Sequence, residues 1–586
     1  MMKRMLLIAA VLAIALTASS ALAAEKIAIN KTNFPDDTFR ERVKEFDLNG
    51  DGYLSGAERG KVKAISVPYA QTLKGVEHFP ALEELRCEGG DLTELDVSKN
   101  TALKTLKCRY NALTALNIGN CTDLTKLECD HNALTKLDVS ACTKLESLIC
   151  GNNELTGLNV KNNKKLALLS CEHNSLTALD VSGCAVLEEL SCYGNSLKSL
   201  KLPAGKKLET LRCFSNRLTG LDVSACTGLK DLMCGGNGLK KLDVTKNTFL
   251  TSLSCEDNPL TALDLSKNTA LTQLCCRNGR LTALDVSRNT LLTELICSGN
   301  KLTALDLSKN GKLTSLSCEN NALSDLDVSA CPALYQLNCG GNRLAGIDLS
   351  KNGKINKDYC RLSGNSRSVT AEAGRIFFAD LEIDGSRVSS VTGAVKSSMF
   401  LTASKSGKVT YKYKARTGMT VKFTLNVTYK KGEISSVTIA KDSFAYTGKA
   451  IKPAVTVKAK ISGRTVKLTK GTHYKVYYKN NVVPGTATIT VKGIGHYKGT
   501  LTKTFRITKV KIASVTLDKT TMTYTGAERK PKVTVKAKVD GVTKTLEKGV
   551  DYSVKYTNNV KRGTATVTVT GIGNFTGTLT KTFTIK

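Results

Sequence analysis

Hydrophobic positions in the middle of the chain repeat with a period of 21 residues. Each unit follows the pattern L-x-x-L-x-C-x-x-N-x-L-x-x-L-D-V-S-x-N-T-x, and a degraded fourteenth unit starts at Ile355. One such unit cannot bury its apolar edge alone, but stacked units share a continuous core to which each contributes a short parallel strand. The pattern therefore predicts a solenoid over residues 62–365, with a capping turn around Ile65. The complete units begin at Leu82, Leu103, Leu124, Leu145, Leu166, Leu187, Leu208, Leu229, Leu250, Leu271, Leu292, Leu313 and Leu334.

The segment L-x-x-L-x-C-x-x-N-x-L resembles the leucine-rich repeat, and the whole unit resembles the 21-residue bacterial class of that family. The resemblance implies a right-handed solenoid with its parallel strands on a concave face. It also implies an asparagine ladder, in which Asn111, Asn132 and Asn174 bond backbone groups at the turns. The architecture is similar to that of internalins and related surface antigens, which implies adhesion without identifying a receptor.

Nineteen of the twenty cysteines occupy two positions of the repeat. Fourteen share one position that strand alternation turns inward, and five replace the second asparagine of the unit; only Cys275 stands at an outward position. Stacked in-register neighbours point the same way, which is poor geometry for a disulfide, and a spacing of 21 residues matches no zinc motif. The sequence predicts free, buried thiols that behave as small hydrophobic side chains.

The outward positions of the strands are aromatic and charged in the first units and bland in the last ones. Aromatic side chains flanked by arginine are typical anchors of protein interfaces, so this surface is a candidate site for a protein or glycan ligand. The alternative is ordinary surface variation, because scattered exposed apolar residues are normal. The candidate residues are Arg109, Tyr110, His131, His173, Tyr193, Arg212 and Phe214.

After the array, the composition changes to Thr, Val, Lys and Tyr, which predicts a β-rich bridging module over residues 366–432. A second repeat follows at an offset of 78 residues, in which Tyr446-Thr-Gly448 matches Tyr524-Thr-Gly526. Alternating apolar and polar residues between Gly, Asn and Pro turns predict antiparallel β-sandwich modules at 433–509 and 510–586. These modules resemble the immunoglobulin-like tandem modules of bacterial surface proteins.

The formal net charge of +34 is concentrated in the C-terminal part of the chain. Residues 401–586 contain 37 Lys and Arg against 7 Asp and Glu, whereas residues 1–400 contain 48 against 44. A net charge of this size favours contact with anionic cell-envelope polymers or another acidic polymer, including extracellular DNA. Lysine also protects sheet edges and aids solubility, which is the alternative explanation. We expect no specific nucleic-acid recognition, because no such motif is present.

Residues 1–23 resemble a secretory signal peptide, with Lys3 and Arg4 before a short apolar run and a small-residue cleavage box at Ala21-Leu22-Ala23. No other stretch is apolar enough for a membrane span, so we expect no transmembrane segment after cleavage. The expected location of the mature protein is extracellular or at a bacterial cell surface.

The segment 24–61 contains a run that resembles the EF-hand calcium loop. A Ca²⁺ ion takes six to eight oxygen ligands, and the residues at the ligand spacing are Asp47, Asn49, Asp51, Tyr53 (backbone carbonyl), Ser55 and Glu58. EF-hands normally pair, and no second loop follows. The expected role is therefore weak, structural Ca²⁺ binding that braces the first repeat; the alternative is an Asx-rich turn of the same composition.

These features favour an exported or cell-surface binding protein, or adhesin, that recognises its partner through the concave face of the repeats. The basic sandwich modules would then act as a spacer and an envelope tether. The alternative is a structural cell-envelope component without a specific ligand. We do not expect an enzyme, because the sequence has no nucleophile elbow, paired zinc ligands or phosphate loop, and its five histidines lack partners at motif spacing.

Overall fold

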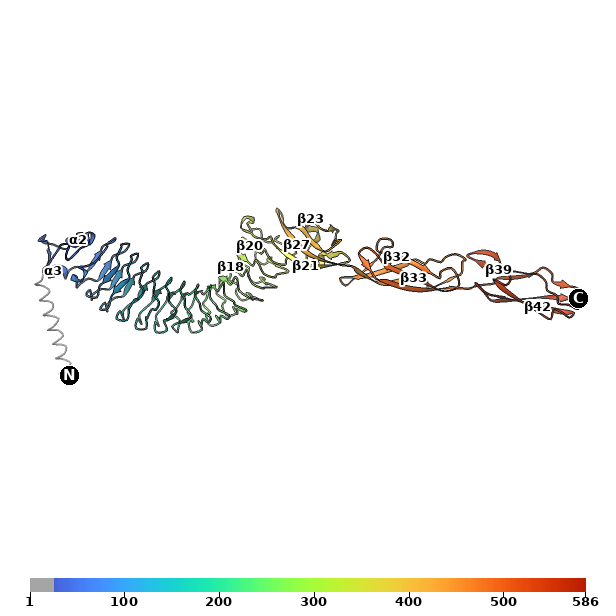
Figure 1. Ribbon diagram of the computed structural model, residues 1–586, viewed down its shortest axis with the longest axis horizontal. Coiled ribbons are helices and arrows are strands. Elements are labelled where there is room, and N and C mark those ends of the chain that lie inside the picture. The colour runs from blue at the N-terminus through green and yellow to red at the C-terminus, as the bar shows by residue number, and fades with distance from the viewer. Residues whose placement is uncertain (1–25) are drawn as a thin grey trace, which may run out of the picture. The chain divides into compact units, whose positions relative to one another are not determined.

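The computed structural model describes residues 26–586 (Figure 1), so the predicted signal peptide at 1–23 lies outside the described residues. The chain divides into two compact units. The first extends to Arg367 and includes Arg387–Ser389 and Tyr411–Thr424; the second consists of Ser368–Ser386, Ser390–Thr410 and Leu425–Lys586. In both units the regular secondary structure is mostly β-strand, which confirms the predicted fold class.

The first unit is a solenoid built on one parallel sheet, which has fourteen strands within the described residues. Each complete repeat supplies a three-residue strand, and the predicted capping turn supplies one more. Neighbouring strands are in register, as for Leu106 opposite Leu127, so equivalent side chains stack in columns. The strands are β3 (Ala64–Ser66), β4 (Glu84–Arg86), β6 (Thr105–Lys107), β8 (Lys126–Glu128), β9 (Ser147–Ile149), β10 (Leu168–Ser170), β12 (Glu189–Ser191), β14 (Thr210–Arg212), β15 (Asp231–Met233), β16 (Ser252–Ser254), β17 (Gln273–Cys275), β18 (Glu294–Ile296), β19 (Ser315–Ser317) and β20 (Gln336–Asn338).

Additional strands of the same length pair elsewhere in the repeats, where the second leucine-rich segment of each unit runs. There, β5 (Glu94–Asp96) pairs with β7 (Ala115–Asn117), and β11 (Ala178–Asp180) pairs with β13 (Ser199–Lys201), both in parallel.

The fourteenth repeat forms no strand in the parallel sheet. Asp358 stands where the complete units carry their second leucine, and this side chain is exposed rather than buried in the core. A 3₁₀ helix, η2 (Lys357–Tyr359), replaces the strand, and a single bridge from Asn338 to Arg361 is left. Cys360 is half-buried, while the other thirteen cysteines of its column are buried. The repeat array therefore ends at this unit.

A small aromatic core closes the N-terminal end of the solenoid. Phe34, Phe39 and Phe79 are completely buried, and the ring centroids of Phe34 and Phe39 lie 5.7 Å apart. Gly75 has a φ of +103°, and a Cβ there would lie 2.4 Å from the Phe34 ring, so only glycine fits. The elements of this cap are β1 (Ile27–Ala28), α2 (Asp37–Lys44), β2 (Tyr53–Leu54), α3 (Gly56–Arg59) and η1 (Val76–His78).

Residues more than sixty positions along the chain close the other end. The Tyr411 hydroxyl donates to the carbonyl of Ala345 at 2.6 Å, and its ring stacks on Phe423. The Arg416 guanidinium donates to the carbonyls of Asn352 (3.0 Å) and Ile355 (2.7 Å), which belong to the last turns. These bonds supply donors to carbonyl groups at the end of the array, where no following repeat can supply them.

The predicted asparagine ladder is present and uses both halves of the amide. Asn258 donates from Nδ2 to the carbonyls of Cys234 (3.0 Å) and Cys255 (3.2 Å), and its Oδ1 accepts from the Leu239 amide at 3.0 Å. Each ladder asparagine therefore ties its own repeat to the preceding one. Its members are Asn111, Asn132, Asn153, Asn174, Asn195, Asn216, Asn237, Asn258, Asn300, Asn321 and Asn342.

A second column of buried side chains uses only the donor half of the amide. Asn268 donates from Nδ2 to the carbonyls of Val244 (3.0 Å) and Asn247 (2.9 Å), but its Oδ1 has no partner among residues 26–586. The same Oδ1 is unpaired in Asn100, Asn163, Asn247, Asn289, Asn310 and Asn352. Cys121 fills the equivalent position and donates its thiol to Val97 at 3.4 Å. Because no acceptor is needed here, cysteine can replace asparagine, as the sequence pattern predicts.

The second unit ends in two modules whose strands repeat at the predicted offset of 78 residues. In the first module, Val457, Ala459 and Ile461 are completely buried, and Val535 and Ala537 repeat this pattern in the second. Most pairs are antiparallel, as expected, but β28–β34, β29–β35, β36–β43 and β38–β44 are parallel. The sheets are therefore mixed rather than wholly antiparallel, because segments early in each module return beside strands near its end.

The strands of the bridging segment are β21 (Ser366–Glu372), β22 (Arg375–Phe377), β23 (Val388–Thr392), β24 (Val395–Lys396), β25 (Phe400–Thr402), β26 (Gly407–Arg416) and β27 (Met419–Lys430), with 3₁₀ turns η3 (Phe378–Leu381) and η4 (Gly385–Arg387). Those of the first module are β28 (Gly432–Ile439), β29 (Ser443–Ala445), β30 (Val455–Ile461), β31 (Arg464–Lys467), β32 (Tyr474–Lys479), β33 (Gly485–Gly493), β34 (Tyr497–Lys498) and β35 (Thr500–Thr508). Those of the second are β36 (Val510–Lys511), β37 (Ser514–Leu517), β38 (Thr521–Met522), β39 (Val533–Val539), β40 (Val542–Thr545), β41 (Tyr552–Thr557), β42 (Gly563–Gly571), β43 (Phe575–Thr576) and β44 (Thr578–Ile585).

The two ladders predict different costs for the same substitution. Asn258→Cys should lower the free energy of unfolding by about 3 kcal/mol, because it leaves the buried Leu239 amide without an acceptor. Asn268→Cys should cost about 1 kcal/mol, because a thiol still donates and no acceptor is lost. Urea unfolding of the two single variants beside the unaltered chain measures both values. Equal losses would contradict the donor-only role of the second column.

Candidate binding face of the repeat sheet

All seven predicted residues lie on the outward side of the parallel sheet, within or just after its strands. Arg109 and Tyr110 follow β6, His131 follows β8, His173 follows β10, and Arg212 ends β14. Tyr193 and Phe214 follow β12 and β14, each at the second residue after the strand. The positions are those that the repeat pattern predicts, but their contacts with one another divide them into two clusters.

The first cluster is built around Tyr110. Its ring lies 4.4 Å from the His131 ring, and the Arg109 guanidinium lies 5.2 Å from the same Tyr110 ring. Asp130 orients both neighbours, because its Oδ2 is 3.0 Å from Nη2 of Arg109 and 2.9 Å from Nδ1 of His131. Tyr110 is nevertheless 52% exposed. The cluster therefore holds an accessible aromatic ring in a fixed position.

Two buried carboxylates lie beneath this cluster. Glu128 and Asp130 are only 4% and 2% exposed, although both occupy outward positions. Lys126 and Lys107 place their ammonium groups 2.8 and 3.4 Å from Glu128. Burial alone would raise the pKa of Glu128, but the hydrogen bond from Lys126 and the charge of Lys107 hold that pKa below its ordinary value. The ion pairs make this part of the face rigid.

The second cluster consists of aromatic side chains from three successive repeats. The Tyr193 and Phe214 rings stack with centroids 4.3 Å apart and planes 9° apart, and His173 meets Tyr193 edge-on at 5.0 Å. Arg212 forms ion pairs with Glu189 and, at 3.9 Å, with Asp231. Burial against these neighbours raises the pKa of Tyr193. An apolar centre flanked by a charged rim is the anatomy of an interface anchor.

Backbone conformation adds a signal that the sequence analysis missed. In every complete repeat, the residue directly before the position of the first asparagine column has a positive φ. Most repeats place Gly, Asn, Asp or Ser there, whereas three place an aromatic ring: Tyr110 (φ 56°), His131 (φ 54°) and His173 (φ 50°). The left-handed region costs an ordinary residue about 1–2 kcal/mol, and a bulky tyrosine is an outlier. The backbone conformation at this position therefore does not account for the presence of a tyrosine.

The N-terminal loop has the oxygen-rich composition that the sequence predicts. The Asp47 carboxylate accepts from the amides of Gly50 (2.9 Å) and Gly52 (2.8 Å), and Glu58 accepts from Leu48 (2.9 Å) and Ser55 (2.8 Å). Hydrogen bonds from Ser55 hold the pKa of Glu58 below its usual range. Asn49, Asp51 and Tyr53 lie on the same loop, and Asp51 and Ser55 both also bond within it.

A positively charged side chain of the protein, that of Lys26, lies against this loop. The Lys26 ammonium is 2.6 Å from Oδ2 of Asp51, and this hydrogen bond raises the pKa of Lys26 and lowers that of Asp51. Within residues 26–586, no group of three or more His, Cys, Asp or Glu side chains converges closely enough to hold a metal ion. A calcium ion would therefore require the loop oxygens to close around it and Lys26 to move away.

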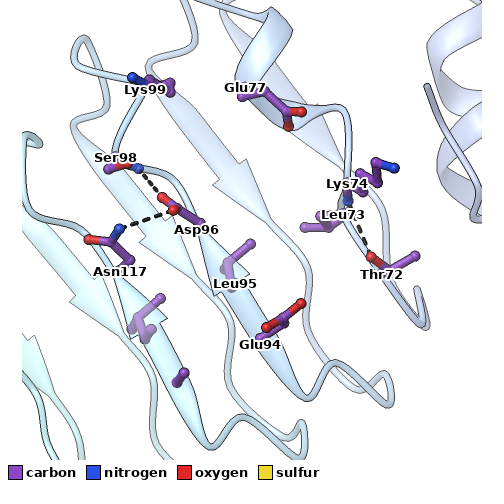
Figure 2. Close-up of a pocket in the computed structure, with 12 residues that line it drawn as sticks. Thr72, Leu73, Lys74, Glu77, Glu94, Leu95, Asp96, Ser98, Lys99 and Asn117 are labelled. Atoms are coloured by element: carbon purple, nitrogen blue, oxygen red, sulfur yellow. Dashed lines mark hydrogen bonds between the residues drawn. The ribbon is translucent and has the colours of Figure 1, made fainter. Parts of the chain in front are cut away.

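The structure also has a cleft that the sequence did not indicate, on the segments that carry β5 and β7 (Figure 2). It has a volume of about 650 Å³. Asp96 accepts from the Ser98 amide at 2.8 Å and from Nδ2 of Asn117 at 3.0 Å, and the Thr72 hydroxyl oxygen accepts from the Lys74 amide. These polar groups bond to one another, so they maintain the walls of the cleft.

All twenty cysteines lie within the described residues and are free thiols. Burial raises the pKa of Cys121 to about 12 and that of Cys142 to about 11, and the inward column is shifted in the same direction. Cys275 is half-buried at its outward position, and its pKa is raised to about 11. Since the thiolate is the nucleophile, we expect these thiols to react slowly at neutral pH.

No family model and no curated protein matches the chain. Among solved structures, it is similar to the functional domain of InlJ from Listeria monocytogenes, which includes a cysteine ladder; the TM-score is 0.58 and the identity 28%, covering 69% of this chain and 99% of that one. An internalin from the same organism gives a TM-score of 0.46 at 21% identity, covering 57% and 98%. A leucine-rich-repeat protein from Leptospira interrogans gives 0.43 at 25%, covering 47% and 76%.

The likeness to the InlJ domain supports the fold described above: a leucine-rich-repeat solenoid with a column of inward cysteines. No helix among residues 26–586 is long and apolar enough to cross a membrane.

The buried thiols predict slow labelling of the folded chain. At pH 8, a thiol of pKa about 11 is about 0.1% thiolate, so Ellman's reagent should label no thiol within minutes. The half-buried Cys275 and Cys360 should react first on longer incubation, and Cys275→Ser with Cys360→Ser should remove this phase. All twenty thiols should react at once in guanidinium chloride. Rapid labelling of more than two thiols in the native chain would contradict the buried column.

Proposed function

We propose that this protein is an exported or cell-surface binding protein that recognises a protein partner through the outward face of its parallel sheet. The observation that carries the proposal is Tyr110. Its exposed ring packs against Arg109 and His131, and its backbone has a positive φ, which is unfavourable for a tyrosine. Strained residues kept in ordered clusters are typical of binding surfaces. The similarity to the functional domain of InlJ from Listeria monocytogenes is consistent with such a role.

The second cluster supports the same interpretation. Tyr193 and Phe214 present stacked rings beside Arg212, and tyrosine, phenylalanine and arginine are enriched in protein interfaces. The ion pairs of Glu128 and Arg212 fix the charged side chains in advance, which lowers the entropy lost on binding. A rigid face of this kind favours a folded protein partner; a glycan is the alternative ligand.

The C-terminal modules suit a tether. They lie within residues 401–586, whose net charge of +30, from 37 basic against 7 acidic residues, favours an anionic cell-envelope polymer. Lysines alternate with buried residues along β39, where Lys536 and Lys538 are exposed on either side of Ala537. We infer immunoglobulin-like modules that combine a spacer with an electrostatic contact, without specific nucleic-acid recognition.

The N-terminal loop is proposed as a weak calcium site. Asp47, Asn49, Asp51, Ser55 and Glu58 would supply side-chain oxygens, and Tyr53 a backbone carbonyl. The attraction of the Lys26 ammonium to Asp51 and Glu58 supports an affinity for cations. Bound calcium would supply charge neutralisation, while the loop's own hydrogen bonds hold its shape. An unpaired extracellular loop suits a dissociation constant on the order of 10⁻⁴–10⁻³ M.

The binding face is tested with a substitution that separates stability from recognition. Tyr110→Asn should leave the melting temperature equal or higher, because asparagine tolerates the left-handed region, yet it should weaken partner binding at least tenfold. The partner is first captured from cell-surface extracts with the full-length chain and then purified for titration. The double variant Tyr193→Ala, Phe214→Ala should show the same loss.

Tyr335→Asn is the matched control, since Tyr335 is 46% exposed but lies outside both clusters. It should leave the affinity unchanged. If Tyr110→Asn and the double variant bind as tightly as the unaltered chain, the binding face is refuted and a structural envelope component becomes the better interpretation.

The calcium site is tested by melting the full-length chain in EDTA and in 10 mM Ca²⁺, on the order of ten to a hundred times the expected dissociation constant. Calcium should stabilise the chain by about 1–3 kcal/mol. Glu58→Gln should abolish the gain while preserving the helix cap, which accepts Gln. Glu41→Gln, an exposed change outside the loop, should retain it. A gain that persists in Glu58→Gln places the calcium effect elsewhere.

A further inference from the structure

A cavity of about 600 Å³ lies in the second unit, between the bridging segment and the edge strand of the first C-terminal module. One wall comes from β22, η3 and β25, and the other from β31. Phe377 and Phe378 line it from the bridging segment, together with Phe400 and Met399. A volume of this size matches sites that hold small molecules.

The apolar wall is built by close ring packing. Phe377 and Phe400 are cross-strand partners in β22 and β25, and their ring centroids lie 5.4 Å apart. Phe378 is 3% exposed and leaves no room behind it, because a Cβ at Gly385 would lie 2.2 Å from its ring. Met399 is 65% exposed beside these rings. The aromatic surface is therefore fixed, and a flexible apolar side chain lies next to it.

Two guanidinium groups lie over these rings, and their charges are balanced differently. Arg464 is 4.4 Å from the Phe377 ring, and Asp380 binds it in a bidentate pair at 2.8 and 3.1 Å. Arg375 is 4.9 Å from the Phe400 ring and half-buried, and among residues 26–586 no carboxylate lies within ion-pair distance of it. A half-buried guanidinium without an acid is costly, and an anion would offset that cost.

We propose that this cavity binds a small molecule that combines a flat apolar body with one anionic group, such as an aromatic carboxylate or sulfonate. The body packs against Phe377, Phe378 and Phe400, and Met399 adjusts to its outline. The planar fork of Arg375, which fits carboxylate geometry, donates to the anionic group, while the exposed Lys467 adds a second positive charge at the other wall. This site is independent of the binding face on the repeats.

The probes are two dyes of similar shape and different charge. 1-Anilinonaphthalene-8-sulfonate is anionic, and N-phenyl-1-naphthylamine is neutral; both fluoresce on entering an apolar site. Titrated into the full-length chain, the anionic dye should bind with a defined stoichiometry of one. Arg375→Gln should weaken its binding about tenfold, as expected for loss of a charged hydrogen bond, and should leave the neutral dye unchanged.

Two further variants separate the cavity from general attraction to a basic surface. Arg562→Gln removes the same charge from over an exposed ring, that of Tyr524, and should leave both dyes unchanged. Ser398→Trp fills the cavity from its lining and should abolish binding of both dyes. Circular dichroism and melting curves establish that each variant is folded.

Three outcomes would overturn the proposal. The first is equal binding of the anionic dye by Arg375→Gln and the unaltered chain. The second is an equal loss in Arg562→Gln, which would mean surface electrostatics. The third is equal affinity for the two dyes, which would mean an apolar groove suited to a protein segment. A tenfold loss confined to Arg375→Gln and the anionic dye supports the site.

Discussion

The structure depends on the side-chain bonds that join each repeat to the one before it. A strand of three residues forms too few backbone hydrogen bonds to hold a sheet alone, so asparagine amides inside the turns add bonds to carbonyl groups of the preceding repeat. Those bonds require that every repeat has the same length, because an insertion would move the amide away from its carbonyls. The strict period of 21 residues therefore follows from the ladder, and in-register columns of side chains follow from the period.

The sequence predicted what depends on that period and less of what depends on distant contacts. The solenoid, the inward cysteines and the outward positions of the seven candidate residues all follow from counting along the repeat. The division into two clusters does not, because it depends on side-chain rotamers, as in the stack of Tyr193 on Phe214. Tyr411 closes the last turn from 66 residues away, and no local pattern specifies such a partner. Similarly, β22 and β31 enclose the cavity only because the bridging segment packs against the first C-terminal module.

The repeats and the C-terminal modules differ in their charge. The repeats are nearly neutral, and their outward charges are largely paired, as those of Glu128 and Arg212 are. Such a face distinguishes partners by shape and by a few fixed side chains. The C-terminal modules carry many more lysines than acidic residues on sheets of matching register, and an array of that kind responds to total charge and to ionic strength. The proposed calcium loop, the proposed binding face and the basic modules would therefore respond to different properties of the surroundings.

The donor-only column has a consequence for how this chain reaches its folded state. Because cysteine fills the inward column and also replaces asparagine in the second one, every repeat carries at least one thiol that is protected only after its neighbours have stacked. In the unfolded chain the same thiols have an ordinary pKa and can form disulfides with any partner that diffuses past. Wherever an oxidant is present, folding competes with oxidation, and a single wrong disulfide would block the stacking of two repeats. Rapid propagation from one repeat to the next is thus a kinetic requirement of this sequence.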